Sequence, residues 1–554
     1  SKYIIRGDWD MKNKWKKLGT ATLLLSITLA GCGTAKSSES KEQSFSVMEQ
    51  SDLLSIDSSK SIDLTSFNMI NNSQEGLYRV AKGNKVVAGL AEKVVKPTNN
   101  GKTYTFKLRK GLKWSNGDAL TAKDFVYSWR RTVNPDTKAG YAYIMDNVKN
   151  ATAINAGKMK PSKLGIKALD KRTVQVTLTQ ATPYFKYLMA FGTFFPQDQK
   201  AVEKYGSKYG TASKYMVYSG PFKMEGWSGT NMSWKLVKND KYWDKKNVAL
   251  SKIPVKVVKD PNTALNLYQG GKLDDALLSG EQATQEKNNK AFVKYSEGQT
   301  AYLAMNFKKG KSTANVNARK AISLVINRKT LTSKVLADGS TPATGFMPAN
   351  FVKNPKTGTD FTKDASNSEA VEYNVAKAKA YWKTALKETG KTKMNFTLVV
   401  SDDDSQKKVA ESVQSAVEQN LPGATVTLRS LPTKGAQSAE LSGNFDMAVV
   451  RWIGDYTDPL TFAQLETTGN TYNYGSFSNK TYDSLVAATN GKDSNNEQKR
   501  YEDFVKAEKL LMDQEAVVPL YQAVQTQLVN QKVKGVVFHP TGAPYDYKWV
   551  HVEK

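Results

Sequence analysis

The chain has 554 residues, of which 40% are hydrophobic and 10% aromatic, so it can build the cores of two or three globular domains. Its one cysteine, Cys32, excludes a disulfide framework and leaves no thiol chemistry in the rest of the chain. The net charge of +28 suits nucleic acid, anionic lipid or an anionic wall polymer, but the lysines run along the whole chain, which favours a solvated basic surface.

A secretory signal peptide is the first predicted segment. Four lysines between positions 12 and 17 precede an apolar stretch at 18–30, and small residues precede Cys32. This order is typical of a signal peptide, and an apolar region of 13 residues is too short for a bilayer span, which takes about 20. Met11 is the predicted start, so residues 1–31 are assigned to upstream residues and signal peptide.

The segment Leu29-Ala30-Gly31-Cys32 resembles the lipobox of bacterial lipoproteins. The resemblance implies that the Cys32 thiol is diacylated and that Cys32 becomes an acylated N-terminus, since two or more acyl chains make a durable anchor. An ordinary cysteine after an ordinary signal is the alternative. We expect residues 32–41 to be a lipidated tether on the outer face of the cytoplasmic membrane, in a Gram-positive type of envelope, where nucleic acid is not a partner.

Alternating and capped segments predict the first elements of the folded part. Residues 104–109 and 172–178 alternate apolar and polar side chains, as half-buried strands do. Residues 115–118 form a turn signal in which Gly117 is free to take a positive φ. Thr121 and Asp124 make a capping-box pattern that opens a helix through residue 131.

Strands and helices alternate in the second half of the chain. Three apolar runs predict strands at 395–400, 424–428 and 445–450. A helix is predicted at 405–420, with valines recurring every four residues on one face, and another at 316–336. One helix between two strands implies a parallel, right-handed βαβ unit, so the fold class is α/β with mixed sheets and several lobes.

Residues that commonly carry chemistry are scarce. The two histidines, His539 and His551, lie near the C-terminus, and no Cys, His and carboxylate cluster has the spacing of a metal site. No phosphate-binding loop or dinucleotide-binding turn occurs, and a Ser-His-Asp triad would have to recruit one of these two histidines. Paired carboxylates of the glycosidase kind are too common to be evidence. We therefore expect no enzyme activity, no cofactor and no metal, and favour a binding protein.

Several stretches, in one order along the chain, resemble the oligopeptide-binding proteins of peptide ABC importers, the family 5 extracellular solute-binding proteins. The most extensive reads GKTYTFKLRKGLKWSNG from Gly101 to Gly117. The others are Leu90–Glu92, Leu120–Trp129, Ser219–Phe222, Asn239–Asp244, Arg319–Ser323 and Trp452–Pro459. Together they span almost the entire mature chain.

The resemblance implies a periplasmic-binding-protein type II fold of the large, three-domain, two-lobed hinge kind (cluster C). Lobe 1, or domain I, would hold residues 42–78, 213–297 and 523–554. An inserted domain II would take 79–212, and lobe 2, or domain III, 298–522, with crossings near 301–307 and 518–523. A ligand favours the closed form because only that form contacts it from both sides.

Asp455 is the predicted anchor of a peptide. Strand addition satisfies a peptide backbone without reading its sequence, whereas a buried α-ammonium group needs a carboxylate. In the family the acid of Trp-x-x-Asp-Tyr pairs with the peptide amino terminus, and Asp455 stands at that position. The alternative is that Asp455 only orders the loop after its strand. Asp458 is interpreted as a turn acid before Pro459.

Further ligand-binding residues follow from the resemblance. Trp452, Gly454 and Tyr456 flank the acid and are expected to shape the site, Gly454 by close approach of ligand backbone. Tyr141, Tyr302 and Glu75 match family cleft positions, with an ordinary core or surface role as the alternative. Arg451, just before Trp452, is a candidate for a different anionic contact, with a solvent-facing arginine as the alternative. The acids at 402–404 precede a helix and are interpreted as its cap.

One departure from the family concerns the peptide carboxyl terminus. Enterobacterial members carry histidine and arginine residues that meet peptide carboxylates. Gln406, Glu440 and Val449 occupy the matching positions here. We therefore expect a different way of holding that end, and a preference for longer peptides.

The resulting prediction is a monomeric, lipid-anchored extracytoplasmic receptor that delivers oligopeptides to the membrane permease and ATPase subunits of an ABC importer. One alternative is the same fold with a peptide pheromone, a dipeptide, nickel or haem as ligand. A second is a basic surface adhesin or chaperone-like lipoprotein, and a third is an envelope hydrolase.

Overall fold

The computed structural model describes residues 42–554, so the signal peptide, Cys32 and the tether to residue 41 lie outside the described residues. Within 42–554, every helix is too short or too polar to cross a membrane. The same residues contain no group of three or more His, Cys, Asp or Glu side chains that could hold a metal ion.

The first body is built from sequence segments that lie far apart. Its four-stranded sheet has the order β1 (Val47–Glu49), β9 (Lys252–Val257), β8 (Ser233–Lys238) and β7 (Phe222–Glu225). Strand β1 pairs in parallel with β9, with Val47 opposite Val255, so segments far apart in the sequence form one sheet. The buried helix α1 (Leu64–Ser73) and the C-terminal strands β17 (Val533–Lys534), β18 (Val537–Phe538), β19 (Tyr545–Asp546) and β20 (His551–Val552) complete it.

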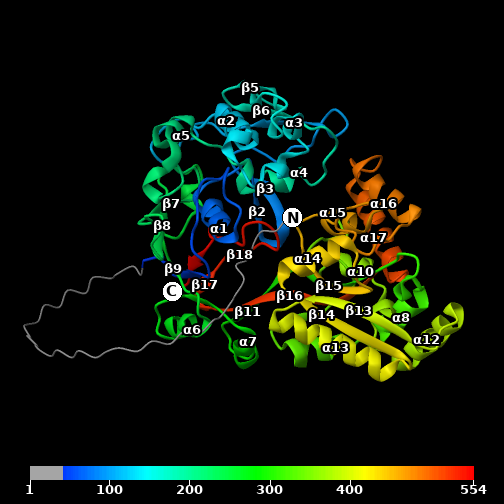
Figure 1. Cartoon of the computed structure of the whole chain (residues 1–554). Coiled ribbons are helices and arrows are strands. Elements are labelled where there is room, and N and C mark those ends of the chain that lie inside the picture. Colours follow the sequence, from blue (N-terminus) through cyan, green and yellow to red (C-terminus); the bar gives the residue numbers. More distant parts are fainter. Residues whose placement is uncertain (1–41) are drawn as a thin grey trace, which may run out of the picture.

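The inserted domain has a three-stranded sheet in the order β4 (Thr103–Lys107), β6 (Thr173–Thr177) and β5 (Ile166–Asp170). The predicted alternation is confirmed, because Tyr104 and Phe106 are buried while Thr105 and Lys107 are exposed. The capping box is confirmed as well: the Thr121 N–H donates to Asp124 at 2.8 Å and opens α2 (Ala122–Val133). This sheet and α2 form the upper end of the molecule in Figure 1.

The second body, here called lobe 2, is organised by a seven-stranded mixed sheet, whose edge strand at residues 275–277 also contacts β1 of the first body. Its order is β10 (Asp275–Leu277), β16 (Val517–Val529), β11 (Phe292–Met305), β15 (Met447–Ile453), β13 (Met394–Ser401) and β14 (Ala424–Leu431), and β12 (Thr341–Pro342) pairs with β16. The predicted βαβ unit has parallel strands β13 and β14 joined by α13 (Asp404–Asn420). Val409, Val413 and Val417 of α13 are buried, as their spacing indicated.

Two long antiparallel strands, β11 and β16, run from one body to the other (Figure 1). Their pairing is irregular between Ser296 and Gln299 and again between Ala301 and Tyr302. Hydrophobic cores lie on either side of this crossing: one draws on residues 45–257 and 529–550, and two draw on residues 301–521. Each body therefore has its own core, with the strand pair between them.

The helix predicted over 316–336 is wrong as one continuous element. The chain forms α8 (Val316–Leu324), the short α9 (Arg328–Thr330) and a π-helical turn at Leu331–Leu336. The break arises because the side chain of Asn327 caps a new helix and accepts from the Thr330 N–H at 3.0 Å. The buried Arg328 then fills the break and donates to the carbonyls of Pro519 and Val371 at 2.6 and 3.0 Å.

Helices complete lobe 2: residues 375–389 pack against α8, and residues 480–490 pack against residues 497–513. These helices are α12 (Val375–Thr389), α14 (Thr433–Ser442), α15 (Leu460–Ala463), α16 (Lys480–Asn490) and α17 (Glu497–Asp513).

Candidate ligand-binding site

Asp455 lies just beyond the carboxyl end of β15, beside the carboxyl ends of β13 and β14. Ligand crevices in α/β sheets form outside the carboxyl ends of the strands. Two backbone hydrogen bonds fix the loop: Gly454 N–H donates to the Gly298 carbonyl at 3.0 Å, and Asp455 N–H donates to Thr461 Oγ1 at 2.9 Å. The backbone of Asp455 is therefore held in place while its side chain lines a cavity.

This cavity has about 50 Å³ of free space and receives walls from both bodies. Lobe 2 contributes Asp455, Tyr456 and Thr457. The opposite walls come from α1, from the end of the inserted domain and from the loop between β18 and β19: Asn71, Val80, Tyr187, Leu188, Ala190, Phe191, His539, Thr541, Gly542 and Ala543. A motion that brings the bodies together therefore closes the cavity around Asp455.

Tyr141 lies next to this cavity. Its ring stacks on Tyr143 at a centroid distance of 5.3 Å and packs against the cavity residue Phe191 at 5.8 Å. Burial raises the pKa of Tyr141, with Tyr143 and the Asp455 carboxylate adding to the shift, and burial followed by Asp455 raises the pKa of Tyr143 to about 12. Two tyrosines of the inserted domain are thus close enough to the acid to sense its charge.

Tyr456 contacts the inserted domain directly. Its ring stacks on that of Tyr184, with centroids 4.0 Å apart and an angle of 2° between the planes. The Asn147 side-chain amide donates to the Tyr184 hydroxyl at 2.7 Å, and Lys186 pairs with Glu497 across the same boundary at 3.5 Å. The segment around α4 (Phe185–Leu188) therefore touches lobe 2 beside Asp455.

Trp452 and Tyr302 occupy core positions. Both point to the same face of the sheet, where Trp452 is 3% and Tyr302 1% exposed, and Phe346 packs edge-on to Tyr302 at 5.0 Å. Neither residue lines the cavity that contains Asp455. A Cβ on Gly454 would lie 2.9 Å from the ring of Phe351, so this glycine makes room for a neighbouring side chain of its own lobe.

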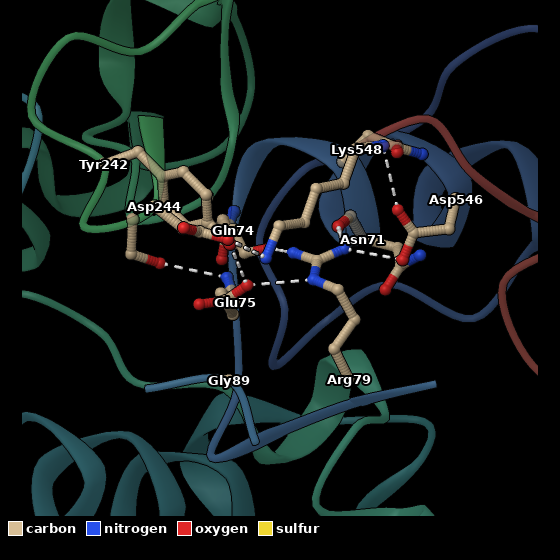
Figure 2. A network of polar contacts seen from close by, with 12 residues as sticks. Asn71, Gln74, Glu75, Arg79, Gly89, Tyr242, Asp244, Asp546 and Lys548 are labelled. Carbon is tan, nitrogen blue, oxygen red and sulfur yellow. Dashed lines mark hydrogen bonds and ion pairs between the residues drawn. The ribbon is translucent and has the colours of Figure 1, made fainter. Parts of the chain in front are cut away.

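Glu75 lies in a buried network of charges within the first body (Figure 2). It accepts from Arg79 Nε at 2.8 Å, from the Tyr242 hydroxyl at 2.5 Å and from Trp243 Nε1 at 2.6 Å. Arg79 in turn donates to Asp546 at 2.8 Å. Figure 2 shows Arg79 between the two carboxylates, so Glu75 ties the first body to the C-terminal segment and does not line the Asp455 cavity.

Arg451 sits half-exposed on β15 and forms a long ion pair of 3.5 Å with Asp403. Nearby, the Gln406 amide donates to the Tyr521 hydroxyl at 2.8 Å. Burial raises the pKa of Glu440 to about 8, against the opposing effect of Arg451, and Val449 is buried in the core. Arg451 is thus the one cation among these positions, and an acid already engages it.

A second, larger cavity of about 330 Å³ lies between α1 and the strands β11 and β16. Four of its 17 lining residues are acids, namely Glu49, Asp63, Glu297 and Asp338. None of the 17 is a lysine or an arginine. Leu64, Leu277, Val524 and Tyr545 supply apolar surface. Strands β11 and β16 therefore border a second, roomier space, whose lining residues differ from those of the cavity at Asp455.

Sequence reasoning missed the walls supplied by the other body. Tyr184, Tyr187 and Phe191 come from an aromatic-rich stretch whose clustering was the available signal. The 539–544 segment carries a Thr-Gly turn signal between two short strands. Neither stretch has a spacing that relates it to Asp455, because only the tertiary fold brings residues about 270 positions apart in the chain together.

Comparison of the sequence and the fold with known proteins identifies one family. The family model of bacterial extracellular solute-binding proteins, family 5 middle, matches residues 85–474. A dipeptide-binding protein of Lactococcus lactis is 40% identical over 552 residues, covering 97% of this chain and 98% of the relative. The peptide-bound OppA structure of Listeria monocytogenes is 40% identical, with a TM-score of 0.68, covering 93% of this chain and 100% of that one.

The unliganded open form of MppA, a periplasmic murein tripeptide binding protein, superposes better, although it is only 28% identical. Its TM-score is 0.81, covering 93% of this chain and 98% of that one. The TM-score is thus higher with this open form than with the peptide-bound OppA structure, although that structure is more similar in sequence, so the arrangement of this chain is more similar to the open form. The fold is that of the type II periplasmic-binding proteins, and the chain belongs to the family 5 bacterial extracellular solute-binding proteins.

Proposed function

We propose that this chain is a lipid-anchored extracytoplasmic receptor that captures oligopeptides by lobe closure and delivers them to an ABC importer. The observation that carries the proposal is the cavity at Asp455, whose walls come from both bodies. A peptide α-ammonium placed there meets a carboxylate, and closure removes both charges from water as a pair. Both the Listeria structure bound to peptide and the Lactococcus dipeptide-binding relative support a peptide ligand.

The second cavity supplies the space for the rest of the peptide. It borders the hinge strands and holds acids but no lysine or arginine among its lining residues. A peptide that runs from Asp455 toward the hinge would pass this cavity with its side chains in hydrated surroundings. The name of the Lactococcus relative favours a second candidate, a receptor for dipeptides.

The lipid anchor and the site of action rest on the lipobox-like segment that ends at Cys32. A diacylated cysteine followed by a tether of about ten residues keeps a receptor within reach of its membrane permease and ATPase subunits. The receptor acts as a monomer, because one molecule contains both walls of the site.

Small-angle X-ray scattering with and without a mixture of short peptides tests the proposal. The open arrangement predicts that the radius of gyration decreases when peptide is added. Peptide binding without compaction, or no binding at all, would contradict capture by lobe closure.

A further inference from the structure

The positive charge of the folded chain is concentrated in the inserted domain. Residues 79–212 contain 25 Lys and Arg against 8 Asp and Glu, a net charge of +17. Lobe 2, residues 298–522, contains 28 against 24, a net charge of +4 over a longer segment. The basic surface expected from composition is therefore not evenly spread, and one domain needs its own explanation.

Within this domain, residues 149–171 contain six exposed lysines and a single acid, Asp170. We name them the basic band: Lys149, Lys158, Lys160, Lys163, Lys167 and Lys171. Asp170 forms an ion pair with Lys107 at 3.8 Å and accepts a hydrogen bond from the backbone N–H of Arg172. This hydrogen bond is the main cause of the lowered pKa of the Asp170 carboxyl group. Within residues 42–554 no lysine of the band forms an ion pair, so their charges are uncompensated.

Lys167 of the basic band lies on the edge strand β5, and Lys171 directly follows this strand at the far end of the molecule. β5 lies at the edge of the sheet β4–β6–β5, and α2 packs on β5 and β6. Figure 1 shows β5 and β6 at the end remote from β11, β16 and the large sheet of lobe 2. Contacts made at this end leave the crevice and the hinge strands uncovered.

Two exposed apolar side chains lie among these lysines. Met159, between Lys158 and Lys160, is 38% exposed. Leu169 is 53% exposed, because an irregularity in the pairing of β5 with β6 between Ala168 and Asp170 leaves it outside the ladder. Lysines alone on an edge strand can be explained as protection against edge-to-edge pairing. That explanation accounts for Lys167, but not for the lysines outside the strand or for the apolar pair.

We propose that the basic band docks on a membrane surface rich in anionic phospholipid. Its ammonium groups face lipid phosphates, and Met159 and Leu169 enter the headgroup region. The combination of cations with protruding apolar side chains is the chemistry of an interfacial lipid contact. A water-soluble anionic polymer would use the lysines alone and give the apolar pair no role. The proposal goes beyond peptide capture and does not depend on it.

The single cysteine of the chain allows a direct test in the full-length protein. In a Cys32→Ala background, Leu169→Cys carries an environment-sensitive fluorophore, and Leu441→Cys, 59% exposed on lobe 2, carries the same fluorophore as a control. Vesicles of phosphatidylcholine with and without phosphatidylglycerol are added. We expect a blue shift at position 169 only with phosphatidylglycerol, loss of the shift in high salt, and no shift at position 441.

Charge variants complete the test. Replacing the six lysines of the band by glutamine should raise the phosphatidylglycerol concentration for half-maximal shift at least about tenfold. A matched control replaces six exposed lysines of lobe 2 by glutamine: Lys353, Lys356, Lys363, Lys379, Lys383 and Lys387. This control should change the phosphatidylglycerol concentration for half-maximal shift by less than about twofold. Unchanged melting temperature and peptide affinity in both variants would show that fold and receptor function are intact.

Several results would overturn the proposal. Equal shifts at positions 169 and 441, or equal shifts with both vesicle types, would show adsorption without a docking face. If the band variant kept the fluorescence shift at position 169, the lysines would take no part in the contact. The band would instead be assigned to a soluble polymer if the parent protein bound polyphosphate, the band variant bound it with the same loss of affinity, and vesicles caused no shift.

Discussion

Arg500 forms a bidentate ion pair with Asp458, in which Nη1 donates to Oδ1 at 2.6 Å and Nη2 donates to Oδ2 at 2.8 Å. Both side chains are less than one-tenth exposed, and a bidentate pair of this kind is among the stronger polar contacts in proteins. Of the two acids after β15, Asp458 is therefore committed inside lobe 2, while Asp455 lines the cavity. This division of roles separates the acid that we propose binds the ligand from the structural one.

Replacing Asp455 by Ala should weaken peptides that carry a free amino terminus by about 2 kcal/mol or more, because the buried ammonium loses its partner. N-acetylated peptides of the same sequence should lose far less, as they present no charge to the acid. Isothermal titration calorimetry on both peptide series measures the difference. Equal losses in the two series would remove Asp455 from the recognition of the amino terminus.

Asp458→Asn is the matched control for that experiment. It leaves Arg500 buried without its anion, so we expect loss of folding stability in denaturant titrations, of the order of 3 kcal/mol. The discrimination between free and acetylated peptides should stay as in the parent protein.

The Tyr184–Tyr456 stack should couple the two bodies energetically. Stacked aromatic pairs contribute about 0.5–1.5 kcal/mol beyond the area that they bury. A double-mutant cycle with Tyr184→Leu and Tyr456→Leu, measured by chemical unfolding, should give a coupling energy in that range. Strict additivity of the two substitutions would show that the rings are neighbours without mutual stabilisation.

The buried network in Figure 2 predicts a large effect at Arg79. Arg79→Met leaves the carboxylates of Glu75 and Asp546 buried together without a cation, and we expect a loss of about 3–5 kcal/mol in unfolding free energy. Lys235→Met breaks the half-exposed pair with Glu225 and should cost less than about 1 kcal/mol. Comparable losses at both positions would refute the special role of the buried network.

Glu466 predicts a pH dependence with a definite sign. Burial raises its pKa to about 8, so between pH 4.5 and pH 8 the unfolded chain releases a proton that the folded chain retains. Its contribution to stability therefore falls as pH rises through this window. Glu466→Gln should match the parent at pH 4.5 and be more stable at pH 8, by at least about 1 kcal/mol.

Thermal unfolding of parent and variant across that pH range measures the effect. The control is Glu225→Gln, which makes the same substitution at a half-exposed glutamate. A Glu466→Gln profile parallel to that of the parent would contradict a buried, protonated Glu466.

Local patterns predicted the elements that depend on local chemistry. The alternation in β4 and β6, the cap of α2 and the valine face of α13 all follow from residues close in sequence. The helix over 316–336 failed because Arg328 and Asn327 make contacts with distant carbonyls and with a new helix start. Such contacts leave no periodic signal in the sequence.

The site was predictable only in part, for the same reason. The position of Asp455 came from a short motif, whereas its cavity depends on Phe191 and Thr541, which the fold brings in from the other body. The family positions at Tyr302 and Glu75 could not be distinguished by sequence from core residues, and both lie buried in this structure. Burial depends on packing between segments that a linear motif does not describe.

Native mass spectrometry of the mature protein, after incubation with a random library of short peptides, tests the central claim most directly. We predict a ladder of bound masses that matches mixed peptides and disappears when the library is N-acetylated. A single discrete mass from the producing cells would favour one dedicated ligand, such as a pheromone. A bare protein mass in the presence of the free library would contradict the proposal that this chain captures peptides.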